Sequence, residues 1–142
     1  MKQLVLFLLA ILLSATAVAE NASRPVLLAK LEELNGDSAR LVGEARSAQA
    51  KATPFRIDVT LYRESLRTLM LSNREIGEEK DRIPQDTLIN MVRMSALLNS
   101  AAECKTGRYI VCPPELMTKL TTQQQLLSED LDHLKAIPAG AD

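Results

Sequence analysis

Residues 27–45 read LLAKLEELNGDSARLVGEA, and the spacing of their apolar side chains decides the fold. Apolar or small residues recur at alternating steps of four and three, which is typical of the seam of a helix in a coiled-coil-like bundle. The seam positions are Leu27, Leu31, Leu34, Ser38, Leu41 and Ala45, and the pattern continues to Ala48 and Ala52. The stretch therefore predicts a helix that buries one face.

Three later segments repeat this spacing. Their seams are Phe55, Val59, Tyr62, Leu66, Leu69, Asn73 and Ile76; Leu88, Met91, Ser95, Leu98 and Ala102; and Met117, Leu120, Gln124, Leu127, Leu131 and Leu134. Short connections favour antiparallel neighbours, so we expect an all-α, up-down-up-down antiparallel four-helix bundle. The alternative is three helices, one of them broken, because Gly36 and Gly43 weaken the first segment and Gly77 can end the second.

Prolines mark where the helices begin, because a first-turn residue needs no N–H. Pro25, Pro54, Pro84 and the pair Pro113–Pro114 stand near the starts of the four segments. Ser23 and Thr53 are natural N-caps, since their hydroxyls can accept a hydrogen bond from the first turn.

The first nineteen residues have the pattern of a secretory signal peptide. Lys2 is followed by an apolar run from Leu4 to Leu13, and Ala17-Val18-Ala19 supplies a small-x-small cleavage site. The run is too short to span a bilayer. We expect a signal peptide over 1–19, a helical bundle domain over 20–137 and a flexible tail over 138–142. The localisation is then periplasmic or secreted, with no integral membrane segment after cleavage.

Charge limits the partner class. Removing residues 1–19 removes Lys2 and no acid, which changes the net charge from −1 to −2. No strongly basic stripe is present to displace counterions from phosphates, so nucleic acid is not expected as a partner. The chain is rich in helix formers and has no Trp.

The two cysteines of an exported chain predict one disulfide. Cys104 closes the third segment and Cys112 opens the fourth, so the bond would lie in the turn between helices three and four. Closing so short a loop stabilises by about 2–3 kcal/mol in the chain-entropy model. The spacing differs from the Cys-x-x-Cys of redox enzymes.

The residues for cofactor, metal or nucleophilic chemistry are missing from the sequence. His133 is the single histidine, whereas haem and di-iron bundles need several ligands. No Gly-x-Ser-x-Gly elbow occurs. We therefore expect no cofactor, no metal and no enzymatic activity.

Residues 88–98 are apolar nearly all round, which indicates either wide core contact or an exposed patch. Some of Ile89, Met94 and Leu97 should then face outward. In the loop between the cysteines, Arg108 and Tyr109 are residue types that anchor interfaces. Met94, Leu97, Arg108 and Tyr109 are the expected partner-binding residues; burial in the core is the competing interpretation.

Two amides interrupt the seams at heights that antiparallel packing brings close. Asn73 and Gln124 would each lie near Met91. Because an unpaired buried amide is costly, we expect them to form a buried hydrogen-bonded pair.

Two short strings resemble known families. Leu120-Thr121-Thr122-Gln123-Gln124 contains one Leu-Thr-x-x-Gln string and resembles the motif of small periplasmic stress chaperones of the Spy and CpxP type, which typically carry two copies. Residues 81–88 are similar to the Ile-Pro helix start of type II secretion pilotins. Those are disulfide-containing four-helix bundles with a lipobox cysteine, which this chain lacks, and Lys80 stands where they have another cysteine.

These observations predict a non-enzymatic exported helical bundle that binds another protein, or itself as a dimer. Such a protein would act as a chaperone, an inhibitor or a secretion accessory. The alternative is a carrier of an apolar small molecule such as a lipid, for which Ala45, Ala48 and Ala52 could leave room between helices.

Overall fold

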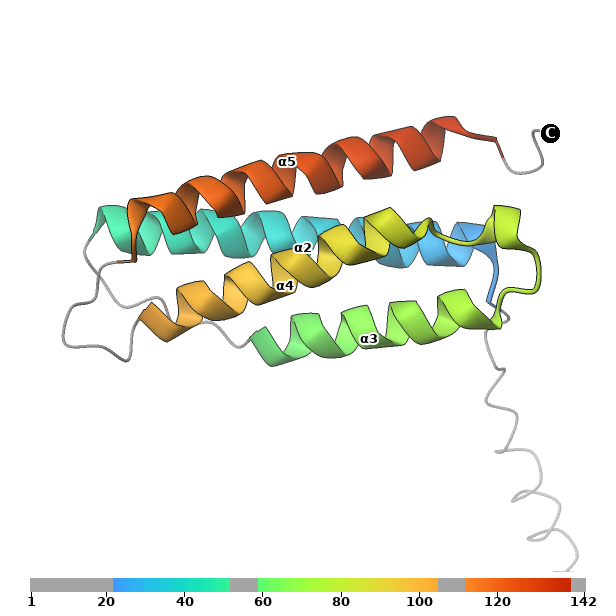
Figure 1. Cartoon of the computed structure of the whole chain (residues 1–142), viewed down its shortest axis with the longest axis horizontal. Helices are drawn as coiled ribbons and strands as arrows, with labels where there is room; N and C mark the ends of the chain where they lie inside the picture. Colours follow the sequence, from blue (N-terminus) through green and yellow to red (C-terminus); the bar gives the residue numbers. More distant parts are fainter. Residues whose placement is uncertain (1–21, 52–58, 105–111, 139–142) are drawn as a thin grey trace, which may run out of the picture.

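The computed structural model describes residues 22–51, 59–104 and 112–138 (Figure 1). These residues form four long helices and one short 3-10 helix. The elements are α2 (Arg24–Ala50), α3 (Val59–Glu75), η1 (Glu79–Asp81), α4 (Gln85–Glu103) and α5 (Pro114–Ala136). The prediction of an all-helical fold with four helices packed against each other is confirmed.

The four long helices lie side by side (Figure 1). α2 contacts α3 and α5, and α4 contacts the same two helices, so these contacts close a ring. α4 also contacts α2 across the diagonal. Between α2 and α5, Glu32 forms an ion pair with Lys135, and Ser38 donates a hydrogen bond to Gln124. Ser38 follows Glu32 on α2, whereas Gln124 precedes Lys135 on α5. These two helices therefore run in opposite directions.

Most of the predicted seam residues that the structure describes are buried in the centre of the bundle. The wholly enclosed large apolar side chains, at 0% exposure, come from all four helices. They are Leu27, Leu69, Met91, Met94, Leu98 and Leu120. Burying each side chain of this size contributes about 1.5–3 kcal/mol, so the seam is the main source of stability.

α2 continues without a break through both of its glycines. Gly36 and Gly43 are exposed, and a Cβ at either position would have no heavy atom within 4 Å. Each costs roughly 0.5–1 kcal/mol relative to alanine. Burial of Leu34, Ser38 and Leu41 on the other face of the helix exceeds that cost, so the broken-helix alternative is wrong for α2.

The predicted hydroxyl cap at Ser23 is absent. Ser23 occupies the N-cap position with extended backbone, φ −135° and ψ 154°, but its side chain makes no capping hydrogen bond. Its carbonyl instead accepts the Leu27 N–H at 3.0 Å, and Pro25 stands in the first turn, which removes one N–H that a cap would serve. The predicted cap at Thr53 lies outside the described residues.

The predicted seam of α4 is wrong at one position. Met94 is fully buried and Ser95 is only half-buried, although the spacing placed Ser95 on the seam. The buried side chains Thr87, Met91, Met94, Leu98 and Ala101 keep the steps of four and three but follow another phase than the predicted one.

The predicted ends of the domain lie mostly outside the described residues. Residues 1–21 and 139–142 are among those not described, so the signal-peptide boundary and the tail stay predictions. α5 ends at Ala136 and is followed by Ile137 and Pro138. None of the helices in the described ranges combines the length and the apolar character needed to cross a bilayer.

Candidate interaction surface

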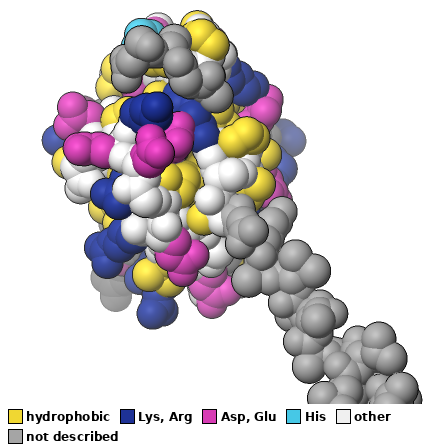
Figure 2. Space-filling view, turned by 90° about the vertical axis from the view of Figure 1, so that its right-hand side faces the viewer, with side chains coloured by type: hydrophobic (Ala, Val, Ile, Leu, Met, Phe, Trp, Pro, Cys, Tyr) yellow, Lys and Arg dark blue, Asp and Glu magenta, His cyan; other side chains and the backbone are white. Residues whose placement is uncertain are grey.

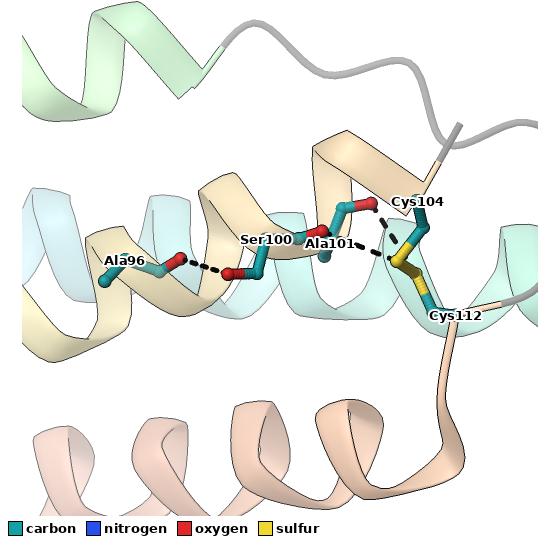
Figure 3. Close-up of a disulfide and its surroundings, with 5 residues drawn as sticks. All are labelled: Ala96, Ser100, Ala101, Cys104 and Cys112. Atoms are coloured by element: carbon teal, nitrogen blue, oxygen red, sulfur yellow. Dashed lines mark hydrogen bonds between the residues drawn. A yellow bond between two sulfur atoms is a disulfide. The ribbon is translucent and has the colours of Figure 1, made fainter. Parts of the chain in front are cut away.

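The predicted disulfide joins the end of α4 to the segment before α5 (Figure 3). Cys104 and Cys112 are bonded, with their Cα atoms 5.3 Å apart. Cys104 directly follows the last residue of α4, and Cys112 stands two residues before Pro114. The bond therefore ties together two helices that pack against each other.

The sulfur atoms of this bond rest against the last turn of α4. Cys112 Sγ lies 3.6 Å from the carbonyl oxygen of Ala101, and Cys104 Sγ lies 3.4 Å from that of Ser100. A disulfide sulfur has no proton to donate, so these are packing contacts. Nearby, Ser100 Oγ donates to the carbonyl oxygen of Ala96 at 3.1 Å (Figure 3).

The predicted pair between Asn73 and Gln124 does not form, because each amide has other partners. Asn73 Nδ2 donates to the Ile83 carbonyl at 3.1 Å, and Asn73 Oδ1 accepts the Ile83 N–H at 2.7 Å. The chain between α3 and α4 folds back over Asn73 and presents its backbone there. Seam spacing cannot show this, since it describes helices and not the segment that joins them.

Gln124 belongs to a polar layer between α2 and α5. Its Nε2 donates to Asn35 Oδ1 at 2.9 Å, and its Oε1 accepts from Ser38 Oγ. Ser128 Oγ accepts from Asn35 Nδ2 at 3.4 Å and donates to the Gln124 carbonyl at 3.1 Å. A layer satisfied by four side chains fixes the register of α2 against α5.

Tyr62 faces this layer from α3. Its hydroxyl lies beside Ser38 but is buried without a hydrogen bond of ordinary geometry. Burial raises the pKa of Tyr62 well above its usual range, and the neighbouring Ser38 opposes this shift only in part.

The four predicted partner-binding residues fare differently. Leu97 is half-buried at the surface of α4, where it can contact a partner. Met94 is fully buried, so its predicted place on the surface is wrong: its side chain is needed in the core. Arg108 and Tyr109 lie outside the described residues.

A groove of about 440 Å³ runs between α4 and α5, with Leu97 in its wall. Three residues of α4 and four of α5 line it: Arg93, Ala96, Leu97, Thr118, Lys119, Thr122 and Gln123. The short side chain of Ala96 leaves the space open. At its base, the buried Gln123 donates from Nε2 to the Asn90 carbonyl at 3.0 Å, which joins the two walls.

Apolar side chains extend this groove along both helices. Ile89 and Val92 precede Ala96 by two turns and one turn of α4, and they are 38% and 47% exposed. Leu126, one turn after Thr122 on α5, is 42% exposed. We call the groove and these three side chains the α4–α5 surface. Exposed apolar residues in one stripe are typical of an interaction site.

Two cations stand at the rim of the α4–α5 surface. Within the described residues, Arg93 and Lys119 form no ion pair, and Arg93 makes only a 3.5 Å contact with Asn90 Oδ1. Their charge is therefore open to a partner. The apolar character of residues 88–98 predicted that α4 has an interaction face. The contribution of Lys119 and Thr122 could not be predicted, because it depends on how α5 packs against α4.

Across residues 22–51, 59–104 and 112–138, no group of three or more His, Cys, Asp or Glu side chains is placed to hold a metal ion.

Comparison with known proteins does not assign this chain to a family, because no family model, no curated protein and no solved structure matches it.

Proposed function

We propose that this chain is an exported, non-enzymatic up-down-up-down helical bundle, with its disulfide in the turn between α4 and α5, that acts by binding another protein. Its compartment would be the periplasm or the extracellular space, and its role that of a chaperone, an inhibitor or a secretion accessory. The α4–α5 surface is the observation that carries the proposal. Its groove is concave and open in the single chain, and exposed apolar side chains continue from it along both helices.

The chemistry of the α4–α5 surface selects a partner segment. From Ile89 to Leu97 the surface follows nine residues of α4, and the eight rises of 1.5 Å between them give about 12 Å, or two helical turns. A groove between two helices accepts the apolar face of a third helix. Arg93 and Lys119 favour acidic residues beside that face. The expected occupant is a short amphipathic helix with acidic flanks.

The test places a photo-crosslinking amino acid at Val92 or Leu97 of the full chain, expressed in its own host. Adducts are identified by mass spectrometry. Leu61, 68% exposed, is the matched control position, since it is also an exposed apolar side chain and belongs to α3 rather than to the α4–α5 surface. The proposal expects one defined protein adduct from Val92 and Leu97 and none of it from Leu61.

Binding of the identified partner is then measured with purified proteins. Leu97→Glu places a carboxylate where the proposal expects an acidic, apolar partner segment, and it should weaken binding by more than about tenfold, or roughly 1.4 kcal/mol. Leu61→Glu should leave binding unchanged. Far-UV circular dichroism checks that both variants keep their helicity. Equal crosslinking at all three positions, or equal binding by both variants, would refute the α4–α5 surface as the working site.

Native mass spectrometry of the protein purified without denaturation distinguishes the carrier alternative. A monomer or dimer of the expected mass agrees with protein binding. A retained mass of a few hundred daltons would make a small-molecule carrier the better explanation.

A further inference from the structure

A second concave site lies at the end of the bundle where α2 begins, away from the disulfide. It is a cavity of about 590 Å³, enclosed by the start of α2, the ends of α3 and α5, η1 and the start of α4. Figure 2 looks onto this end of the molecule, where dark-blue Lys and Arg side chains and magenta Asp and Glu side chains lie beside one another in the upper part of the view. The volume falls within the range of small-molecule sites, about 300–1,000 Å³.

Arg24 is the deepest charge in this cavity. The residue is only 9% exposed, and its guanidinium donates from Nη1 to the Lys80 carbonyl and from Nη2 to the Leu134 carbonyl, each at 3.2 Å. It forms no ion pair with any described residue. A buried cation is costly without a counter-charge, and a guanidinium has five N–H groups, more than two carbonyls can use.

The groups around Arg24 add to the positive charge. Arg74, Lys80 and Arg82 line the cavity, whereas Glu79 is the one carboxylate among its lining residues. Arg82 is held in place, since its Nε donates to the Ile76 carbonyl at 2.8 Å. Lys80 lies 3.5 Å from the Glu78 carboxylate, and both side chains are more than half exposed, which makes that pair a weak competitor.

A helix N-terminus opens onto the same cavity. Pro84 and Gln85, at the start of α4, belong to its lining, and no side chain caps this helix. The first N–H groups of a helix have no intrahelical acceptor and carry a partial positive charge, so they favour an anion. In α4 the N–H of Leu88 is bonded to the Pro84 carbonyl at 3.2 Å. Asp86, in the same turn, is exposed.

We propose that this cavity binds a small organic phosphate, with its phosphate group among Arg24, Arg74 and Arg82 and its apolar part against Met70, Leu88 and Ile137. A phosphate dianion matches the excess of cations better than a single carboxylate. The arginine fork suits phosphate oxygens, which accept two parallel hydrogen bonds. The cavity is larger than a phosphate ion, and its apolar lining accounts for the remainder. This site is separate from the α4–α5 surface.

The sequence holds one signal for this site. α2 has no acidic residue in its first turn and begins with a cation, Arg24, where the helix dipole favours an anion. An arginine beside the positive end of a helix dipole needs a compensating interaction. Its hydrogen bond to the Leu134 carbonyl, in the last turn of α5, is one such interaction, and binding of an anionic ligand is the second.

The experiment titrates the chain from Glu20 with n-hexyl phosphate by isothermal calorimetry. Inorganic phosphate and hexanol test the two halves of the ligand, and phosphatidylcholine vesicles with and without phosphatidic acid test a lipid headgroup as the source. We expect saturable single-site binding of hexyl phosphate and weaker binding of inorganic phosphate. If the protein sediments with phosphatidic acid vesicles but does not bind hexyl phosphate, and if the variants below abolish this sedimentation, the same cavity binds a lipid headgroup.

Arg74→Gln is the main variant, because this side chain is exposed and its loss leaves the fold intact. It should weaken hexyl phosphate binding by roughly tenfold, the effect of one charge-assisted contact. Arg24→Lys should weaken it further. Arg93→Gln on the α4–α5 surface is the matched control and should change nothing. Absence of both saturable hexyl phosphate binding and variant-sensitive sedimentation with phosphatidic acid vesicles would overturn the proposal. Equal hexyl phosphate affinity in the parent protein and Arg74→Gln would also overturn it, as would hexanol binding as tightly as hexyl phosphate.

Discussion

Replacing Asn73 by leucine tests whether one side chain holds the connection between α3 and α4. Asn73 forms two hydrogen bonds to the backbone of Ile83, and both residues are buried. Leucine has the same number of side-chain heavy atoms, with the same branch at Cγ, and leaves the Ile83 N–H and C=O without partners. Each unpaired buried backbone group costs about 1–3 kcal/mol. The two together should lower the free energy of unfolding by about 3 kcal/mol.

Urea denaturation followed by far-UV circular dichroism measures this loss. For a domain of about 100 residues, 3 kcal/mol also corresponds to a drop in Tm of about 12 °C or more. Asn99→Leu is the matched control. Asn99 donates to Glu103 on the solvent side of α4, so its replacement should change stability by no more than about 0.5 kcal/mol.

Two results would refute the reasoning. One is a loss for Asn73→Leu below about 1 kcal/mol, which would mean that water or a backbone shift satisfies Ile83 at little cost. The other is unchanged hydrogen exchange at the Ile83 amide, since this N–H loses its acceptor in the variant.

Two further perturbations follow from buried and open positions. Gly36→Ala and Gly43→Ala should each raise the free energy of unfolding by about 0.5–1 kcal/mol in urea titrations, because a methyl group meets no atom at either site. The control Ala39→Gly, exposed on the same helix, should lower the free energy of unfolding by as much. A loss of stability in the two alanine variants would contradict the open space at Gly36 and Gly43. For Tyr62, burial raises the pKa of the folded state above that of the unfolded state, so stability should fall as the pH rises above about 10, where the unfolded chain ionises first. Tyr62→Phe should remove that part of the pH dependence, and an identical stability profile above pH 10 in both proteins would contradict the assignment.

The sequence predicted burial correctly at positions where the seam spacing of a single helix determines which side chains are buried. Leu27, Leu31 and Leu34 follow the seam spacing of α2 and are buried. Tyr62 and Leu66 do the same on α3. In each case, burial of one helix face decides the conformation, and a local pattern contains that information.

The errors occurred where two phases of the repeat are open or where a connecting segment intervenes. Met91 can be followed on the seam by Met94 or by Ser95, and the buried residues of α4 follow the phase with Met94. Asn73 bonds to Ile83 because the segment after α3 turns back over it. Arg24 attracted no attention in the sequence, since its environment is assembled from residues at five separate places in the chain.

The disulfide also bears on the order in which the chain folds. Cys104 and Cys112 are the two cysteines of the sequence and lie eight residues apart, so a single intramolecular pairing exists and the thiols meet after closure of a short loop. Oxidation can therefore precede the packing of α2 and α3. In a chain oxidised early, the disulfide already links α4 and α5 as a covalent hairpin. The helices α2 and α3 then pack onto two helices that are held close together.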